Sequence, residues 1–278
     1  MNLTSPSQVK AWCIEHGFHP NKTLGQNFLI DRNVLESIVD TGLKDARDGE
    51  PVLEIGPGLG VLTEEILHRG HDVIAIEKDP ALADTLAERL AGSEAAGKAS
   101  LRVVQADALD VQIPSLEPRP EIMVSNLPYQ AGTRILIELA SQRGMRTMTA
   151  LLQSEVVERL GAKEGSRARS LASVLVQLDY DVETVRKVAA TCFWPRPEIG
   201  SAVVRLVRHE RFAALEADER KLFKQLAKIA FSHRRKQLAS IFKGITASTA
   251  RAETLSMEDW IDFTRIYKEK EKQRSKEP

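Results

Sequence analysis

Cysteine is scarce in this sequence, and no long apolar run occurs. The two cysteines, Cys13 and Cys192, belong to no paired-cysteine pattern, which argues against a disulfide framework or a Cys-x-x-Cys zinc site. No stretch of about 18 apolar residues appears, and the N-terminal MNLTSPSQVKAWC lacks the charged and apolar parts of a signal peptide. We therefore expect a cytoplasmic protein without a membrane span and without a metal site.

An excess of either charge is also missing, because 39 basic residues balance 39 acidic ones. The balance is uneven along the chain: residues 1–180 carry 18 Lys/Arg against 25 Asp/Glu, and residues 181–278 carry 21 against 14. From Lys221 to Lys243 there are seven basic residues and no acidic one. Solvated helix faces usually mix both signs, so this stretch favours contact with nucleic acid. The candidate contacts are Lys221, Lys224, Lys228, Arg234, Arg235 and Lys236.

The order of apolar patterns predicts the fold class. From residue 51 to about 155, short apolar runs alternate with longer amphipathic ones, which is typical of βαβ units and a mostly parallel sheet. After Arg208 helical periodicity takes over. We expect an α/β domain over residues 1–208, with residues 1–50 as an N-terminal helical extension, and a small all-helical domain over residues 209–278. In such a sheet the ligand site lies at the carboxyl ends of the strands.

A glycine-rich loop follows the first expected strand of the sheet. The segment EIGPGLG places Gly56, Gly58 and Gly60 between a strand and a helix, where backbone N–H groups and the helix N-terminus can approach a ligand. A dinucleotide fingerprint requires a third small residue where Val61 stands, so a nicotinamide cofactor fits poorly. S-adenosylmethionine is the better candidate.

Acidic residues end the next two strands. Glu77 closes VIAIE at the distance where an acid accepts hydrogen bonds from ribose hydroxyls. Asp107 closes VVQAD, where a carboxylate can accept the exocyclic amine of an adenine. Considered alone, each acid could equally be a surface residue at the end of a strand with no role in ligand binding. Three features at three successive strand ends point into one crevice, and together they favour a nucleoside cofactor.

The segment SNLPY ends the fourth strand at the rim of the same crevice. The amino group of adenine is a poor nucleophile because its lone pair is delocalised into the ring. The side-chain carbonyl of Asn126 and the backbone carbonyl of Leu127 would localise that lone pair by accepting its two N–H groups. Pro128 restricts Leu127 to an extended conformation, and Tyr129 offers a stacking face for the base.

A second aromatic ring is expected on the other face of that base. Phe193, in the proline-rich loop FWPRPE, can supply it, and Trp194 is the neighbouring alternative. Either ring can equally serve in packing, and the composition does not choose between them.

Several motifs occur together in the order of a known family. KTLGQNFLID, VLEIGPGLGVLTEEIL, VIAIEKD, VVQADAL, VSNLPY, FWPRPEIGSAVVRL and FSHRRKQL cover nearly the whole chain. The sequence resembles the ribosomal RNA adenine dimethyltransferases, and within them the small-subunit enzymes that dimethylate two adjacent adenosines of 16S rRNA. The resemblance implies a Rossmann-like fold that uses S-adenosylmethionine.

The resemblance also implies roles for particular residues. Asn27 and Leu29 of GQNFL would join Gly56, Glu77, Asp107 and Asn126 in binding S-adenosylmethionine. Phe193 would hold the adenine against Tyr129. The basic helical domain would dock on the small (30S) ribosomal subunit during its biogenesis, and we expect the protein to act as a monomer.

The chain departs from the family pattern at a few positions. Gln130 follows NLPY where an asparagine is usual, and Arg169 stands where a tyrosine is common. Arg196 and Glu198 replace a proline and a lysine in the aromatic loop. These changes leave the methyl-donor site intact and bear on the RNA target and on the extent of methylation.

Three other functions fit parts of the pattern. A large-subunit rRNA adenine methyltransferase of the antibiotic-resistance type shares the glycine loop and the asparagine-proline-aromatic motif. A catalytically silent assembly factor for ribosomes or transcription would keep the fold, and a DNA adenine methyltransferase would use the same phosphate contacts. The NLPY motif, the long helical C-terminus and the intact site residues favour the small-subunit enzyme.

Overall fold

The computed structural model describes residues 2–21, 25–90 and 99–274 and divides into two compact units. The first unit comprises Met1–Val157 and Val182–Arg208, and the second comprises Glu158–Asp181 and His209–Pro278. The expected boundary after residue 208 coincides with one junction between them. Residues 158–181, which the sequence pattern assigns to the α/β domain, belong to the second unit.

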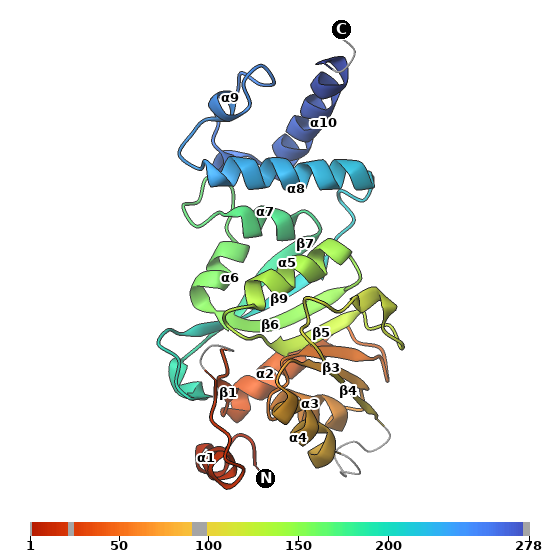
Figure 1. Cartoon of the computed structure of the whole chain (residues 1–278), viewed down its shortest axis with the longest axis vertical. Coiled ribbons are helices and arrows are strands. Elements are labelled where there is room, and N and C mark those ends of the chain that lie inside the picture. Colours follow the sequence, from red (N-terminus) through yellow and green to blue (C-terminus); the bar gives the residue numbers. More distant parts are fainter. Residues whose placement is uncertain (1, 22–24, 91–98, 275–278) are drawn as a thin grey trace. The chain divides into compact units, whose positions relative to one another are not determined.

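One mixed sheet organises the first unit (Figure 1). Among the described residues, seven strands form it in the order β4-β3-β2-β5-β6-β9-β7. In chain order these are β2 (Val52–Ile55), β3 (Val73–Glu77), β4 (Leu101–Gln105), β5 (Ile122–Asn126), β6 (Thr147–Gln153), β7 (Tyr180–Val188) and β9 (Ser201–Arg208). The pairs from β4 to β6 are parallel, and β9 runs antiparallel to β6. This confirms the Rossmann-like α/β expectation.

Burial follows the position of each strand in the sheet. Every residue of β2 and β3 is buried, which is typical of parallel strands covered on both faces. The edge strand β4 has only half-buried and exposed residues. The strands that carry the glycine loop and Glu77 therefore lie in the rigid interior.

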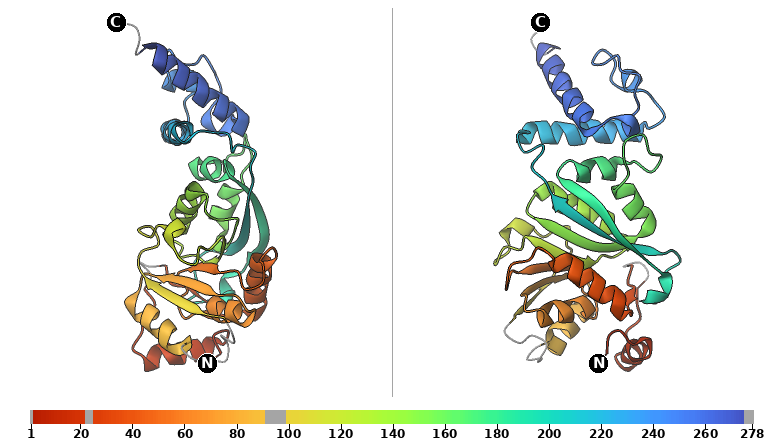
Figure 2. Two further views of the ribbon diagram at one scale, coloured as in Figure 1. Left: turned by 90° about the vertical axis from the view of Figure 1, so that its right-hand side faces the viewer. Right: turned by 180° about the vertical axis from the view of Figure 1, so that it is seen from behind.

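Helices cover both faces of the sheet. They include α2 (Arg32–Leu43), α3 (Val61–His68), α4 (Pro80–Leu90) and α5 (Gly132–Gln142), and α6 (Ser154–Leu160) lies at a junction between the units. Helix α1 (Pro6–Glu15) instead packs against Leu59 of the glycine loop and Leu82 of α4. In Figure 1, α5 lies in front of the sheet, whereas α2 lies in front in the rear view of Figure 2, so these two helices cover opposite faces.

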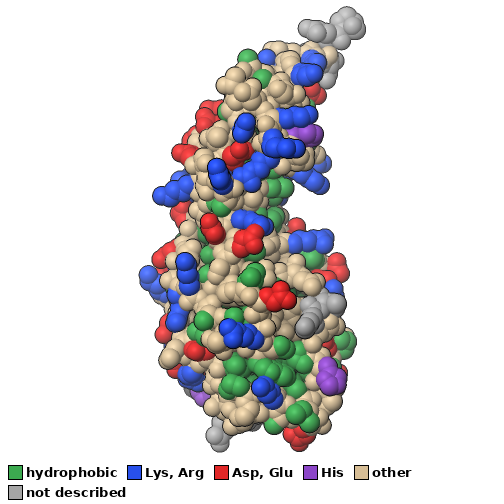
Figure 3. Space-filling model, turned by 90° about the vertical axis from the view of Figure 1, so that its left-hand side faces the viewer, with side chains coloured by type: hydrophobic (Ala, Val, Ile, Leu, Met, Phe, Trp, Pro, Cys, Tyr) green, Lys and Arg blue, Asp and Glu red, His purple; other side chains and the backbone are tan. Residues whose placement is uncertain are grey.

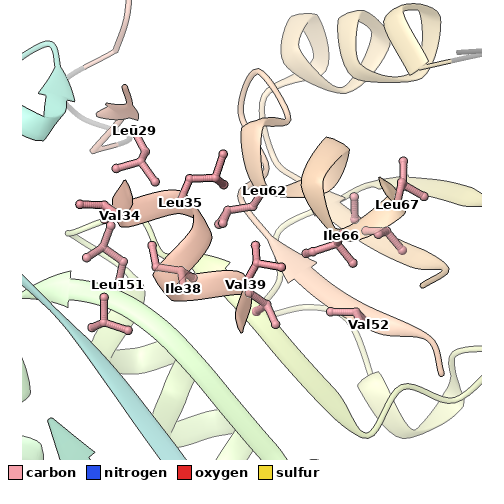
Figure 4. Close-up of a cluster of buried hydrophobic side chains, with 14 of the residues drawn as sticks. Leu29, Val34, Leu35, Ile38, Val39, Val52, Leu62, Ile66, Leu67 and Leu151 are labelled. Atoms are coloured by element: carbon pink, nitrogen blue, oxygen red, sulfur yellow. The ribbon is translucent and has the colours of Figure 1, made fainter. Parts of the chain in front are cut away.

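Helix α2 is part of the main core. It begins at Asp31, whose side chain accepts a hydrogen bond from the Val34 N–H at 2.9 Å and so caps the first turn. Ile38 and Val39 are fully buried, and they share one cluster with side chains of α3, β2 and β6 (Figure 4). The segment 1–50 therefore contributes a core helix in addition to the outer helix α1.

A short second sheet joins the beginning of the chain to the aromatic loop. Strand β1 (Phe28–Leu29) pairs antiparallel with β8 (Phe193–Trp194), placing Phe28 opposite Trp194 and Leu29 opposite Phe193. Nothing in the sequence pattern predicted this pairing. It brings GQNFL and FWPRPE together across more than 160 residues.

The second unit is built from α7 (Leu171–Gln177), α8 (Ala217–Ser232), α9 (Leu238–Ile241) and α10 (Met257–Arg274) around an aromatic core. The fully buried rings of Phe223 and Trp260 meet edge to face with centroids 6.1 Å apart. Arg220 of α8 binds both carboxylate oxygens of Asp179 at 2.8 and 2.9 Å. This partly buried ion pair ties residues 158–181 to α8.

Candidate functional site

A cavity of about 380 Å³ opens in the first unit where β2, β3 and β5 end. This volume is within the range of small-molecule and cofactor sites. Its lining includes most of the residues that we expected to bind the cofactor or to act in catalysis: Asn27, Leu29, Gly56, Gly58, Glu77, Asp107, Asn126, Leu127 and Pro128. Gly60, Tyr129 and Phe193 are not among the lining residues.

The glycine loop is held in a backbone shape that favours glycine. Gly56, Gly58 and Gly60 have φ of 66°, 58° and 84°. A β-carbon at Gly58 would lie 3.2 Å from the Phe28 ring, and one at Gly60 would overlap Leu86. The absence of a side chain at Gly58 therefore leaves space beside the Phe28 ring in the cavity. At Gly60 it allows Leu86 of α4 to pack against the loop.

Arg89 of α4 holds the glycine loop in place through hydrogen bonds. Its guanidinium donates a hydrogen bond to the Leu59 carbonyl at 2.8 Å and another to Glu64 at 2.8 Å. The sequence carries no signal of this contact, because α4 has the pattern of an ordinary amphipathic helix.

Glu77 is the acceptor at the end of β3. The side chain is 6% exposed and accepts backbone hydrogen bonds from Gly58 at 3.1 Å and Asp79 at 2.9 Å. Burial raises the pKa of this carboxyl, and the two backbone N–H groups oppose the rise. Glu77 thus links the glycine loop to the expected ribose position.

Glu54 is a second buried acid in the cavity wall, and the sequence analysis gave it no role. It is 1% exposed, and its Oε2 accepts a hydrogen bond from the Thr63 hydroxyl at 2.6 Å. Burial raises the pKa of Glu54 to about 8; the Thr63 bond lowers it, and the nearby Glu77 raises it further. The sequence signal that could have identified Glu54 is an acidic residue within the otherwise apolar run of β2.

Asp107, which follows β4, is an ionised acceptor. Lys78 Nζ lies 2.8 Å from its Oδ2, and the Leu109 N–H donates to Oδ1 at 3.0 Å. The Lys78 hydrogen bond lowers the pKa of Asp107 below its usual value. The partnership of Lys78 with Asp107 was not visible in the sequence, where the two are 29 positions apart.

Asn126 is oriented by the N-terminal segment. Its Nδ2 donates to the Asn27 carbonyl at 3.1 Å, so this hydrogen bond assigns Oδ1 as the acceptor that the side chain offers to a substrate. The Leu127 N–H donates to the Leu151 carbonyl at 3.2 Å, and both Asn126 and Leu127 line the cavity. Two acceptors therefore lie side by side at the end of β5.

The two expected stacking rings contact each other. Tyr129 and Phe193 have centroids 6.4 Å apart at an interplanar angle of 72°, and the Tyr129 hydroxyl bonds to Ser201 Oγ at 2.6 Å. Trp194 instead stacks on Phe28, which favours Phe193 as the partner of Tyr129. A base held between parallel rings would require these rings to turn, so the sandwich stays a prediction.

The basic residues expected to contact RNA belong to the second unit. Lys221, Lys224 and Lys228 lie on α8, and Arg234, Arg235 and Lys236 follow it. Among the described residues the three lysines form no ion pair, whereas Arg234 Nε lies 3.9 Å from Glu253 Oε2. Figure 3 shows Lys and Arg side chains gathered over this unit on the face drawn there.

Two of the residues that depart from the family pattern, Gln130 and Arg169, lie in different parts of the structure. Gln130 lines the cavity beside Pro128. Arg169 is 3% exposed, and burial lowers the pKa of its guanidinium. It is not among the cavity-lining residues, so a change there acts first on the packing of the second unit.

A family model described as ribosomal RNA adenine dimethylase matches residues 17–273. The chain belongs to this family. Like other ribosomal RNA adenine dimethylases it is a methyltransferase, and S-adenosylmethionine is the methyl donor that the family implies.

Similar members of the family come from bacteria. A ribosomal RNA small subunit methyltransferase A from Nocardia farcinica is 36% identical over 94% of this chain and 89% of its own length. The protein of the same name from Deinococcus radiodurans is 43% identical over 73% of this chain and 67% of its own.

Solved structures share the fold. A dimethyladenosine transferase from Plasmodium falciparum superimposes with a TM-score of 0.72 at 23% identity, covering 87% of this chain and 98% of that one. The 23S rRNA methyltransferase ErmE gives a TM-score of 0.62 at 26% identity, covering 87% and 100%.

Proposed function

We propose that this adenine dimethylase transfers methyl groups from S-adenosylmethionine to N6 of two adjacent adenosines in small-subunit (16S) rRNA, two to each. The small-subunit target follows the names of relatives that are about 36% identical over most of the chain. One observation carries the chemistry: the glycine loop, Glu77, Asp107 and the two acceptors at the end of β5 line one cavity.

The residues present fit the methyl donor. Glu77 would accept the ribose hydroxyls, and Asp107, beside Lys78, would accept the adenine amine of the cofactor. Bound S-adenosylmethionine supplies an electrophilic methyl carbon on a sulfonium. Gly58 leaves room for a ligand to approach the backbone of the loop.

Catalysis then depends on holding the substrate amine. Asn126 Oδ1 and the Leu127 carbonyl accept its two N–H groups, which localises the nitrogen lone pair toward the methyl carbon. Because Asn27 already holds the amide of Asn126, the acceptor is oriented before substrate binds. The proton leaves to water after transfer, and direct displacement needs no metal.

The partners proposed for this reaction are the small (30S) subunit or its precursor. The lysines of α8 contact phosphates, and the protein acts as a cytoplasmic monomer. In the ranges that the structure describes, no helix is long and apolar enough to cross a membrane.

To test this proposal, the transfer of a labelled methyl group from S-adenosylmethionine to unmethylated 30S subunits is measured. The RNA is then digested with nuclease, and the adenosines are analysed by mass spectrometry. We expect dimethyladenosine at two neighbouring positions. Unmethylated 50S subunits and duplex DNA serve as competing substrates. Transfer to either of these in preference to 30S would contradict the proposed target.

A further inference from the structure

The side chain of Tyr129 is held at both of its ends. Its hydroxyl shares a hydrogen bond of 2.6 Å with the hydroxyl of Ser201, which is fully buried at the start of β9. At the other end, a β-carbon at Gly25 would lie 3.0 Å from the Tyr129 nitrogen, so the N-terminal segment packs closely on that backbone. Stacking on a base needs only the ring, and a phenylalanine would supply one. The hydroxyl of Tyr129 therefore requires a separate explanation.

The sheet fixes the position of the Ser201 hydroxyl. Ser201 lies opposite Gln153 in the antiparallel pair of β6 and β9, and the Ser154 N–H donates to the Gly200 carbonyl at 3.0 Å beside it. Strand β6 pairs in turn with β5, which ends at Asn126. The anchor of the Tyr129 hydroxyl and the acceptors for the substrate amine are thus built on neighbouring strands of one rigid sheet.

The second expected stacking ring is fixed more completely. Phe193 is 3% exposed and belongs to the main core, and its backbone pairs with Leu29 between β1 and β8. Tyr129 is only half-buried. Of the two rings, Tyr129 is therefore the one that can change its orientation without disturbing the core.

The spacing of the two rings is already close to that of a base sandwich. A base stacked between two parallel rings needs ring planes about 7 Å apart, two contacts of about 3.5 Å each. The centroids of Tyr129 and Phe193 are 6.4 Å apart, but the planes meet at 72°. The angle is the larger change required. Rotation about the last torsion of a tyrosine side chain is soft, and the hydroxyl oxygen lies on the axis of that rotation. The ring can therefore turn while its hydroxyl stays in place.

We propose that Ser201 is a positioning residue for methyl transfer: it anchors the Tyr129 hydroxyl as a pivot about which the ring turns to stack on the substrate adenine. This inference rests on the proposed function because it assumes an adenine in the cavity. Burial raises the pKa of the Tyr129 phenol and the Ser201 hydrogen bond lowers it, with a net rise, so the hydroxyl keeps its proton at neutral pH. It acts as an anchor and not as a base.

Steady-state methyl transfer to unmethylated 30S subunits tests the pivot. Ser201→Ala and Tyr129→Phe each remove one hydroxyl of the pair, and each should lower kcat by about 2- to 10-fold, the effect of one hydrogen bond. The KM for 30S should stay unchanged, because the proposed phosphate contacts lie on the second unit. Calorimetry should give the wild-type Kd for S-adenosylmethionine, because neither Ser201 nor Tyr129 lines the cavity.

Three further variants separate a pivot from a general packing role. The double variant Ser201→Ala with Tyr129→Phe should lose no more kcat than either single variant, because both changes remove the same bond. Ser201→Thr keeps the hydroxyl and should restore kcat toward the wild-type value. The matched control is Thr149→Val on β6, which removes a fully buried hydroxyl that has no hydrogen-bond partner among the described residues. It should behave as the wild type.

Several outcomes would overturn the inference. These are a wild-type kcat in Ser201→Ala, losses that add in the double variant, or a weakened Kd for the cofactor in Ser201→Ala, which would indicate damage to the cavity. If Ser201→Ala does not fold by circular dichroism, Tyr129→Phe decides the question alone, because it leaves the sheet intact; a wild-type kcat in that variant would refute the pivot. Absence of transfer to 30S by the wild type would refute the proposed function, and the inference would fall with it.

Discussion

The cavity of the first unit and the basic face of α8 use charge in opposite ways. The cavity presents Glu54 and Glu77, which are buried and held by a hydroxyl and by backbone N–H groups. Helix α8 presents Lys221, Lys224 and Lys228 without recorded acidic partners among the described residues. The proposed ligands also differ in sign, because the cofactor is cationic and RNA is anionic.

Burial explains why the two regions should behave differently. Exposed charges are screened within about 10 Å at 0.1 M salt, whereas charges in a closed cavity are screened much less. A few buried acceptors can therefore fix one geometry with a large effect for each residue. The lysines add affinity that is spread over several residues and sensitive to salt.

The largest effect is expected in the cavity, from Asn126→Ala. Loss of the oriented acceptor should reduce kcat by about 10²–10³-fold, the range for removing one preorganised polar group from a transition state. RNA affinity should stay nearly unchanged, because the phosphate contacts are elsewhere. Single-turnover methyl transfer at saturating cofactor checks this, with Asn33→Ala on the exposed first turn of α2 as control. Turnover like that of the wild type would sink the mechanism.

A smaller effect is expected for Glu77→Ala. Hydrogen bonds to a charged group contribute about 1.5–3 kcal/mol, so Kd for S-adenosylmethionine should rise roughly 10- to 150-fold. RNA binding without cofactor should not change. Calorimetric titration measures the first and filter binding the second, with Glu88→Ala as the matched control. An unaltered Kd would show that the acid at the end of β3 does not contact the cofactor.

On the basic face, the triple change Lys221→Gln, Lys224→Gln and Lys228→Gln should weaken RNA binding in a salt-dependent way. Three lost phosphate contacts lower the slope of log K against log salt concentration by about 2–3. RNA binding between 50 and 200 mM salt measures that slope, while cofactor affinity should hold constant. The control removes the same charge from the exposed Lys10, Lys44 and Lys270. An equal loss in the control would mean that only net charge matters.

The smallest effect is expected at Lys78, an exposed side chain that pairs with Asp107 of the cavity. Lys78 is exposed, so Lys78→Gln should change Kd for the cofactor by less than about fivefold at pH 7. The pKa of Asp107 lies below its usual value because of Lys78. Without Lys78, Asp107 is still ionised at pH 7, and the benefit of the pair is lost only as pH falls through the pKa of Asp107. A large change at pH 7 would mean that Lys78 itself contacts the ligand.

The sequence by itself determined the sheet and the strand-end positions of the site. Apolar runs alternating with amphipathic segments dictate βαβ units, and parallel strands place their carboxyl ends at one edge. Gly56, Glu77 and Asn126 could therefore be assigned to one crevice. These signals are local, since each depends on residues within one strand and the loop that follows it.

Only the tertiary structure decided the long-range contacts. The pairing of β1 with β8 joins segments more than 160 residues apart, and the Arg220–Asp179 ion pair ties residues 158–181 to the second unit. The angle between Tyr129 and Phe193 likewise depends on packing. So does the raised pKa of Glu54, which burial raises most, the Thr63 hydrogen bond lowers, and Glu77 on another strand raises further. Periodicity along the chain encodes elements, whereas the environment of a side chain exists only after those elements have packed.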